Sequence, residues 1–339
     1  MSKIAVVLFN LGGPQSLSEV RPFLFKLFYD RNIISLANPL RFILATLISY
    51  FRKNKAIKIY KYLNGKSPIL EETNKQASSL ELMLNNHNEN QYKVFIFMRY
   101  SEPSAKNTVE SVCKYSPDQI ILLPLYPHYS TTTTLSAIQH WNHYIKKIKL
   151  EVPTSTTCCY YNNKNYIKAQ CQLIIEKYQK AKNYGVPRIL FSAHSLPLSI
   201  IQQGDPYQHQ IEENVSLIIQ ALNIPSLDYK ICYQSRIGPT KWLEPNTLSE
   251  INQAKKDNVP IVLVPISFVS ENSETLVELD IEYKAVISKE NMFFRVPTLS
   301  NHEDYIKCLQ DICIYGNKNT CPAQYKMCFD ALHSCTNKN

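Results

Sequence analysis

Glycine is scarce in this sequence, since only 7 of its 339 residues are glycines. A dinucleotide-binding loop requires three glycines in the pattern GxGxxG, and a P-loop requires GxxxxGK followed by Ser or Thr. Neither pattern occurs in the chain. The segment NLGGP at residues 10–14 follows an apolar run and predicts a tight turn. The sequence therefore lacks both common phosphate-binding loops.

Motifs for nucleic-acid recognition are also absent. The chain contains no zinc-finger spacing, no RNP motif and no long basic arm, which argues against a nucleic-acid partner. Its net charge is nevertheless +9. Much of that excess is spread as single lysines. The positive charge therefore weakly indicates an acidic partner, such as an anionic membrane or ligand.

The amino terminus has no long apolar run and no small-residue cleavage site, so it predicts a first buried strand and not a signal peptide. We therefore expect an intracellular, cytoplasmic protein. The 10 cysteines are irregularly spaced, which in such a compartment argues against a disulfide framework. Hydrophobic residues make up 45% of the chain and charged residues 19%, as in a soluble globular protein.

Strand-like runs alternate with helix-like stretches. The expected strands span residues 4–9, 92–98, 119–124, 188–192, 229–233 and 260–265. Amphipathic stretches that predict helices include residues 74–85, 105–114, 165–182 and 208–221. This alternation predicts an α/β fold with parallel sheets covered by helices on both faces. We expect two doubly wound domains, residues 1–150 and 151–305, with a cleft between them, followed by a cysteine-rich extension over residues 306–339.

Residues 33–51 are unusually apolar. A membrane-spanning helix needs about 20 mostly apolar residues, and Pro39 and Arg41 interrupt this stretch. Four basic residues follow it: Arg52, Lys53, Lys55 and Lys58. An apolar stretch with a basic flank is typical of a segment that lies on an anionic bilayer surface, for example on the inner face of a membrane. The alternative is a helix packed on the core or at a dimer interface; the sequence predicts no oligomeric state.

A histidine lies where one of the predicted strands ends. The run RILFSAHSLP at residues 188–197 places His194 at the carboxyl end of a strand, which is where ligands bind in open parallel sheets. A histidine there can accept a proton near neutral pH or bind a metal ion; the alternative is an ordinary structural histidine. The segment YQSRIGP at residues 233–239 follows another strand, and its polar residues, with Arg236, either line the same cleft or cap a helix.

A row of carboxylates follows the strand at residues 260–265. Ser270 is a plausible N-cap for a helix that carries Glu274, Glu278 and Glu282, and the i, i+4, i+8 spacing places all three on one face. Such a row of hard oxygen ligands could hold or conduct a divalent cation. The alternative is a solvated acidic face with lysine partners.

Taken together, these segments resemble a known family. They are NLGGP at 10–14, GKSPI at 65–69, MRY at 98–100, LYPHYS at 125–130, FSAHSLP at 191–197, GDPY at 204–207, YQSRIGP at 233–239 and residues 268–283. In type and order they resemble ferrochelatase, a lyase that inserts Fe²⁺ into protoporphyrin IX to form protoheme in the last step of heme biosynthesis. The resemblance implies two Rossmann-like, chelatase-type domains with four-stranded parallel sheets, with ferrous iron and protoporphyrin as the substrates.

The resemblance also implies roles for the acidic and basic residues. His194 matches the family's active-site histidine, and Glu274 matches the glutamate that faces it across the porphyrin, so both are candidate catalytic residues and metal ligands. Glu278 and Glu282 match an acidic path for protons or metal. Many members have a histidine two residues before the glutamate, whereas this chain has Asn272. Since an amide cannot relay protons, the proton path must rely on His194 and the carboxylates.

Four further residues match the porphyrin cleft. Met98, Arg99 and Tyr100 would lie in it, with Arg99 near a propionate, and Trp242 would form an apolar wall. Residues 33–51 match an apolar lip through which the porphyrin would enter from a membrane. Their hydrophobicity favours protoporphyrin over the more anionic coproporphyrin.

The end of the chain is rich in cysteine. Cys308, Cys313, Cys321, Cys328 and Cys335 lie beyond residue 300. Some ferrochelatases hold a [2Fe–2S] cluster with C-terminal cysteines and one internal cysteine, and the first four of these residues are candidate ligands. The position of the internal ligand is Thr131 here, for which Cys158 or Cys159 could substitute. Buried free thiols or a zinc site are the alternatives.

Other functions remain compatible with these residues. Imidazole and carboxylate ligands accept several divalent ions, so a chelatase for another metal is one alternative. A chelatase that metallates coproporphyrin is another. A non-catalytic protein that binds a tetrapyrrole or a metal is the third, although such a carrier needs no opposed base and carboxylate.

Overall fold

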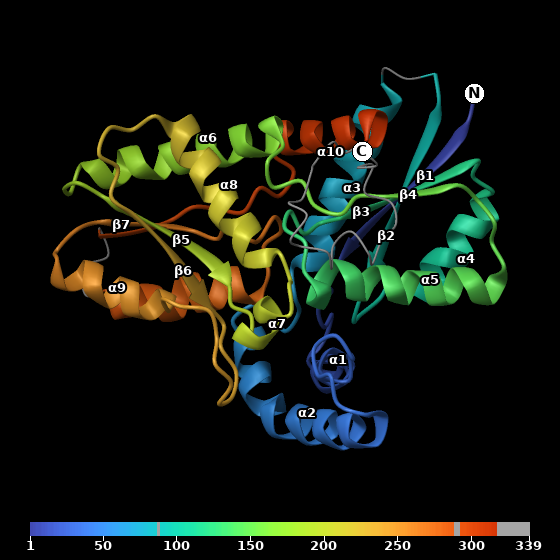
Figure 1. The fold of residues 1–339 in the computed structure, drawn as a ribbon, viewed down its shortest axis with the longest axis horizontal. Coiled ribbons are helices and arrows are strands. Elements are labelled where there is room, and N and C mark those ends of the chain that lie inside the picture. Colours follow the sequence, from blue (N-terminus) through green and yellow to red (C-terminus); the bar gives the residue numbers. More distant parts are fainter. Residues whose placement is uncertain (87–88, 288–291, 317–339) are drawn as a thin grey trace.

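Two parallel sheets organise the molecule (Figure 1). The computed structural model describes residues 1–86, 89–287 and 292–316. The N-terminal half has a sheet of strand order β2-β1-β3-β4 and the C-terminal half a sheet of order β6-β5-β7-β8. The strands are β1 (Lys3–Asn10), β2 (Gln91–Met98), β3 (Gln119–Pro124), β4 (Thr154–Thr156), β5 (Arg188–His194), β6 (Tyr229–Gln234), β7 (Ile261–Val264) and β8 (Phe293–Arg295). Both sheets are four-stranded and parallel, which confirms the predicted fold class.

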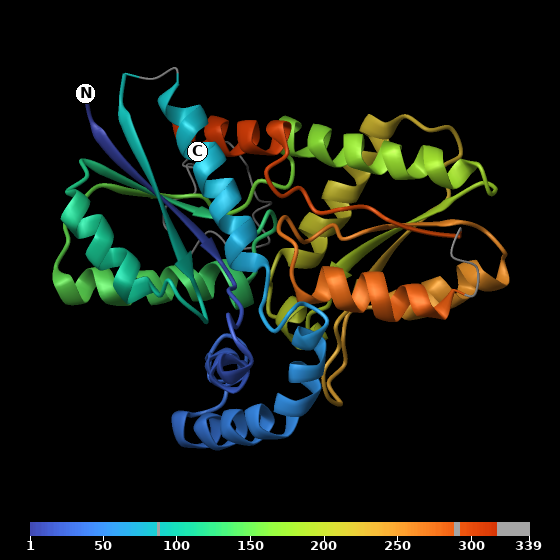
Figure 2. The same cartoon turned by 180° about the vertical axis from the view of Figure 1, so that it is seen from behind.

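Helices cover the faces of both sheets (Figure 2). In the N-terminal half they are η1 (Leu17–Glu19), α1 (Val20–Phe28), α2 (Asn38–Lys61), α3 (Ile69–Asn85), α4 (Ala105–Tyr115), the π-helix η2 (Thr131–Leu135) and α5 (Ser136–Ile148). In the C-terminal half they are α6 (Lys164–Lys182), α7 (Leu198–Gln202), α8 (Tyr207–Leu222), α9 (Thr247–Lys256), the π-helix η3 (Glu274–Tyr283), η4 (Lys284–Val286) and α10 (Glu303–Tyr315). The four helices predicted from amphipathicity all form, because their apolar faces pack on the sheets.

The edge strands β4 and β8 were not predicted from the sequence. Each is three residues long, too short for a strand's alternating pattern to be recognised. β4 pairs with β3, so the N-terminal sheet extends past residue 150, where the sequence placed the division between domains. A strand of this length depends on its neighbour for its hydrogen bonds, and only the tertiary structure supplies that neighbour.

The two halves share a hydrophobic core. One cluster joins Leu8 of β1 and Leu80 of α3 to Tyr166 of α6 and Ile306 of α10. The helix α10 contacts both α6 and α3, and Figure 1 shows it lying across the top of the molecule between the halves. The first part of the predicted cysteine-rich extension, up to Tyr315, therefore contributes to the shared core; residues 317–339 lie outside the described residues.

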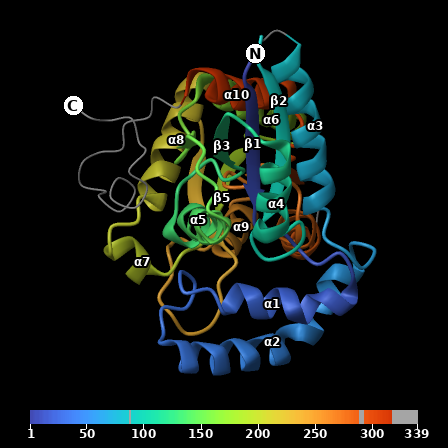
Figure 3. The ribbon, with the colours of Figure 1, turned by 90° about the vertical axis from the view of Figure 1, so that its right-hand side faces the viewer.

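The helices α1 and α2 project from the body on the side where β1 ends (Figure 3). Apolar side chains on α2 are exposed: Leu40, Phe42, Ile43, Leu47, Tyr50 and Phe51. The Pro at the start of α2 is compatible with the first helical turn. Within the described ranges, no helix combines the length and apolarity that crossing a membrane would require.

Candidate functional site

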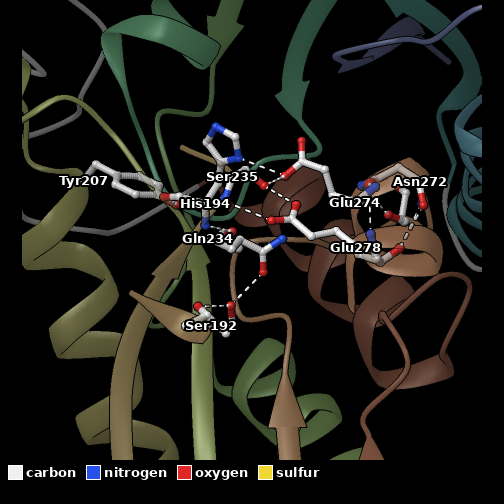
Figure 4. Close-up of polar contacts among 12 residues, drawn as sticks. Ser192, His194, Tyr207, Gln234, Ser235, Asn272, Glu274 and Glu278 are labelled. Carbon is white, nitrogen blue, oxygen red and sulfur yellow. Dashed lines mark hydrogen bonds and ion pairs between the residues drawn. The ribbon is translucent and has the colours of Figure 1, made fainter. Parts of the chain in front are cut away.

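His194 and Glu274 meet at the carboxyl end of the C-terminal sheet (Figure 4). His194 is the last residue of β5, and Glu274 is the first residue of η3. The imidazole Nδ1 lies 2.9 Å from Glu274 Oε2. The two residues are 80 positions apart in the chain, and the fold brings together the pair that the sequence singled out.

The strand order explains why the pair forms here. β5 lies between β6 and β7, so the chain leaves β5 on one side and returns on the other, which creates a crevice at the strand ends. Side chains from the segment after β7 and from the start of α8 then hold the backbone of the histidine. Its backbone N–H donates to Ser267 Oγ at 3.0 Å, and its carbonyl accepts from the Tyr207 hydroxyl at 3.0 Å.

Ser235 joins two carboxylates of the site. It follows β6, and its Oγ lies 2.8 Å from Glu274 Oε2 and 2.5 Å from Glu278 Oε2. Its backbone N–H also donates to Glu278 Oε1 at 3.2 Å, and the Tyr283 hydroxyl donates to that oxygen at 2.8 Å. One hydroxyl has one hydrogen to donate, so it can serve only one of the two carboxylates at a time.

Ser235 was not identified as a site residue from the sequence. Its φ of +64° is in the left-handed region, which is unfavourable for a residue other than glycine and is concentrated at functional sites. The only sequence signal was its place in a polar segment after a strand. Arg236 beside it does not face the carboxylates, because its guanidinium pairs with Glu244 at 2.6 Å and donates to the Leu243 carbonyl.

The titratable groups of the site shift one another's pKa values. Burial alone would lower the pKa of His194, but the charge and hydrogen bond of Glu274 raise it above its usual value. Burial disfavours the charge of Glu274, yet His194 and the donor hydrogen bonds hold the pKa of that carboxyl below its usual value. Burial and the neighbouring charge of Glu274 raise the pKa of Glu278. The opposite shifts of His194 and Glu274 favour an ion pair between them, and the carboxyl of Glu278 next to them binds a proton more strongly than an ordinary glutamate does.

The helix η3 differs from the expected one in type and in its cap. It is a π-helix over its whole length, and Asn272 caps it with an Oδ1 that accepts from the N–H groups of Glu274 and Thr275. The expected N-cap, Ser270, instead donates to Gln76 of α3 at 3.0 Å. Only the tertiary contact with α3 distinguishes the two polar residues. Glu282 is exposed at the far end of η3.

Arg99 and its neighbours lie in a different environment from the one expected. The guanidinium of Arg99 pairs with the buried Asp30 at 2.6 Å and donates to Ser136 Oγ at 2.8 Å. The hydroxyl of Tyr100 donates to the same aspartate at 2.7 Å. Met98 and Tyr100 are 0% and 1% exposed. Arg99 is thus paired with a carboxylate of this chain, and its place near a propionate stays a prediction.

Unlike Arg99, the basic residue Arg52 is partly buried without an ion-pair partner among the described residues. It lies on α2, three residues after the buried Ser49 and eight before the buried Tyr60, so these side chains share the inward face of the helix. Burial lowers the pKa of Arg52, and none of the ion pairs among the described residues involves Arg52. Tyr60 on the same face reaches Ser273 beside Glu274. In the sequence, Arg52 is distinguished only as the first residue of the basic flank that follows residues 33–51.

Trp242 lies beside the strand end that carries His194. It forms an isolated antiparallel bridge with Pro197, and its indole N–H is buried without a hydrogen-bond partner in the described residues. It is partly buried, and its role as a wall of the porphyrin cleft stays a prediction.

The described cysteines do not assemble a ligand set for a [2Fe–2S] cluster. Cys308 and Cys313 are 0% and 8% exposed in the apolar core around α10, and burial raises the pKa of both thiols, which disfavours thiolate ligands. Thr131, at the position of the internal ligand, hydrogen-bonds to the buried Asp205. Among residues 1–86, 89–287 and 292–316, no three His, Cys, Asp or Glu side chains group so as to hold a metal ion. Cys321 and Cys328 lie outside these ranges.

Comparisons with known proteins are consistent across sequence and fold. The sequence model of the family described as Ferrochelatase matches residues 3–315. A ferrochelatase of Wolbachia sp. subsp. Drosophila simulans (strain wRi) is 59% identical over 312 residues, covering 92% of this chain and 99% of that protein. A ferrochelatase of Rickettsia bellii (strain OSU 85-389) is 49% identical over 313 residues, covering 92% and 86%. SirB from Bacillus subtilis, in a structure with Fe³⁺, shares the fold with a TM-score of 0.50 and 13% identity, covering 92% of this chain and 94% of that one.

Proposed function

This chain belongs to the ferrochelatase family, and on that premise we propose that it inserts Fe²⁺ into protoporphyrin between His194 and Glu274. As a ferrochelatase it is a lyase that inserts ferrous iron into a porphyrin in heme biosynthesis. The proposed location of iron insertion rests on the contact between His194 and Glu274 at the strand ends. A chelatase for another metal and a non-catalytic binding protein are less well supported, because the relatives that match over most of the chain are ferrochelatases.

The proposed chemistry requires the loss of two pyrrole protons and the entry of a metal. A base with a pKa near neutrality suits proton removal. Once His194 has released the proton that it holds in the ion pair with Glu274, its imidazole has a free nitrogen for that task or for the metal. In the resting site the carboxylate of Glu274 is paired with the imidazole of His194. A proton taken up there has an onward acceptor, since Ser235 connects Glu274 to Glu278. Glu282 would extend this route toward the surface.

The apolar lip at residues 33–51 favours protoporphyrin as the substrate, and Arg52 is a candidate partner for one of its propionates. The exposed apolar residues of α2 suit a ring with vinyl groups better than coproporphyrin, which has additional propionates in their place. Since Asp30 neutralises Arg99, Arg52 is the more suitable cation for a propionate. Trp242, Met98 and Tyr100 would support the ring or the walls around it.

We also propose that α2 contacts an anionic membrane surface. Its exposed apolar residues precede Lys53, Lys55 and Lys58 on the same helix. Apolar area and basic charge together give binding to anionic bilayers. An apolar porphyrin would then enter the site without crossing bulk water.

Anaerobic metallation tests the proposed function. The purified protein is mixed with Fe²⁺ and either protoporphyrin or coproporphyrin, and metalloporphyrin formation is followed by absorbance. We expect faster metallation of protoporphyrin, and we expect the His194→Ala variant to lose about 100-fold or more in turnover while keeping its fold, because it lacks the base. No metalloporphyrin from either ring would refute the proposal, and a His194→Ala variant with wild-type turnover would refute the site.

The [2Fe–2S] cluster stays a prediction. The environments of Cys308 and Cys313 do not favour it, and no step of the reaction depends on it. Iron and sulfide analysis of anaerobically purified protein, with its visible spectrum, tests it directly.

A further inference from the structure

The helix that carries the site's carboxylates is of an uncommon type. Ten residues, Glu274–Tyr283, form the π-helix η3, whereas most π-helical segments are single turns inserted in α-helices. A π-helix of this length has poorer intrinsic stability than an α-helix, so contacts from the rest of the fold must favour it. A change to α-helical bonding would rotate Glu278 relative to Glu274 and so change how the two carboxylates lie against Ser235.

Arg295 makes such contacts at both ends of η3. It is the last residue of β8, the edge strand of the C-terminal sheet. Its Nη1 donates to Glu271 Oε1 at 2.9 Å, just before the helix, and its Nε forms an ion pair with Asp280 Oδ1 at 2.7 Å, near the helix end. The side chain is only 11% exposed. Burial alone would lower the pKa of Arg295, but Asp280 and Glu271 raise it, so the charge is retained.

Glu271 connects this arginine to the first turn of η3. Its Oε1 also accepts from the Thr298 N–H at 3.0 Å, and its other carboxylate oxygen accepts from the Thr275 hydroxyl. Thr275 follows Glu274 directly. The contacts thus run from β8 and the segment after it to the residue next to the site's carboxylate, without touching His194 or Ser235.

From these contacts we infer that Arg295 is a positioning residue of the iron-insertion reaction: it braces η3 at Glu271 and Asp280 and so holds Glu274 and Glu278 toward His194 and Ser235. A planar guanidinium suits this task because its fixed fork serves two carboxylates at once, which a lysine ammonium does not match. The inference deepens the proposed function and rests on it for its kinetic consequence, but the brace itself is a property of the fold.

The chain offers a matched control in the same sheet. Arg188, at the amino end of the strand that carries His194, also pairs with two carboxylates, Asp228 at 2.9 Å and Asp257 at 2.7 Å. Its side chain is 14% exposed, close to the value for Arg295. Loss of either arginine removes a double ion pair from the C-terminal half, but only Arg295 contacts the segment of η3.

The test compares Arg295→Met, Arg295→Lys and Arg188→Met in the full-length protein. We expect Arg295→Met to lose about 100-fold in kcat for iron insertion, since small misplacements of reacting groups cost that much, while protoporphyrin affinity measured by fluorescence quenching stays as in the wild type. Arg295→Lys should recover part of the loss. Arg188→Met should lower the melting temperature comparably and keep its kcat. Wild-type kcat in Arg295→Met, or an equal loss in Arg188→Met, would overturn the inference.

Hydrogen exchange separates this inference from the proposed function. In peptides that cover residues 274–283, backbone amide hydrogens should exchange faster in Arg295→Met than in the wild type. In Arg188→Met they should exchange at the wild-type rate. Both results are expected whether or not the protein metallates protoporphyrin. If the wild type inserts no iron but these peptides respond as expected, the function is refuted and the brace stands. Unchanged exchange in Arg295→Met would refute the brace alone.

Discussion

Glu278 holds its carboxyl group in an environment that disfavours negative charge. Burial and the adjacent Glu274 raise its pKa above the ordinary value of 4.5, so the folded protein binds this proton more tightly than the unfolded chain does. Its ionisation therefore costs stability once the pH exceeds the unfolded value, and the cost grows until the folded pKa is reached. A carboxyl with so unfavourable an ionisation, placed next to His194, is typical of a functional site.

Glu278→Gln tests this balance. The amide cannot ionise, so we expect the variant to be more stable than the wild type at about pH 8 and equally stable below about pH 4, in urea unfolding at each pH. Turnover should fall by about tenfold or more, because the proton acceptor beyond Ser235 is lost. The exposed Glu282→Gln serves as the control for stability alone and should shift it by less than about 0.5 kcal/mol. Equal stability of wild type and Glu278→Gln at both pH values would contradict the argument.

At the scale of elements, α2 combines two surfaces with different roles. Its inward face carries Ala45, Ser49 and Tyr60, all buried, and packs on α1 through the cluster around Phe23 and Tyr100. Its outward face exposes residues such as Leu47 (48%) and Phe51 (74%). Asp30 lies two residues after the end of α1. Its ion pair with Arg99 holds that end of α1 against the N-terminal sheet. An exposed apolar face on a firmly held helix suits a lipid surface better than a core.

A triple variant of α2 tests membrane contact. Leu40→Gln, Leu47→Gln and Phe51→Gln together remove exposed apolar area without disturbing the inward face, so we expect about tenfold or greater loss of binding to anionic vesicles in flotation assays. Leu82→Gln on α3, which removes an apolar side chain 65% exposed elsewhere, is the control and should bind as the wild type does. Equal flotation of the triple variant would exclude α2 as the contact.

At the scale of the whole molecule, buried polar contacts join the two halves behind the site. Gln76 of α3 is 0% exposed and donates to the carbonyls of Val269 at 2.9 Å and Ser300 at 3.0 Å. Asn10, at the end of β1, donates to Ser270 Oγ at 3.3 Å. These contacts fix the segment that leads into η3 against the N-terminal half. With the shared core around α10, they make independent unfolding of the halves unfavourable.

Gln76→Ala tests the coupling of the halves. Loss of the amide leaves two buried carbonyls without their donor, which should lower the free energy of unfolding by about 2 kcal/mol. Trp141 lies in the N-terminal half and Trp242 in the C-terminal half, so Trp141→Phe and Trp242→Phe backgrounds report on each half separately. We expect both reporters to follow one transition that moves together in Gln76→Ala. Two separate transitions in the wild type would show that the halves unfold independently.

The sequence by itself determined the six longer strands, the α/β class, and the candidates His194 and Glu274, because apolar runs and strand-end motifs are local patterns. It did not reveal the short strands β4 and β8, the link through Ser235, the neutralisation of Arg99 by Asp30, or the bracing of η3 by Arg295. Each of these depends on a contact between residues distant in the chain, such as the 69 positions between Asp30 and Arg99. Only the tertiary structure sets those contacts, because burial and partner geometry decide which charges are neutralised and which stay free for a substrate.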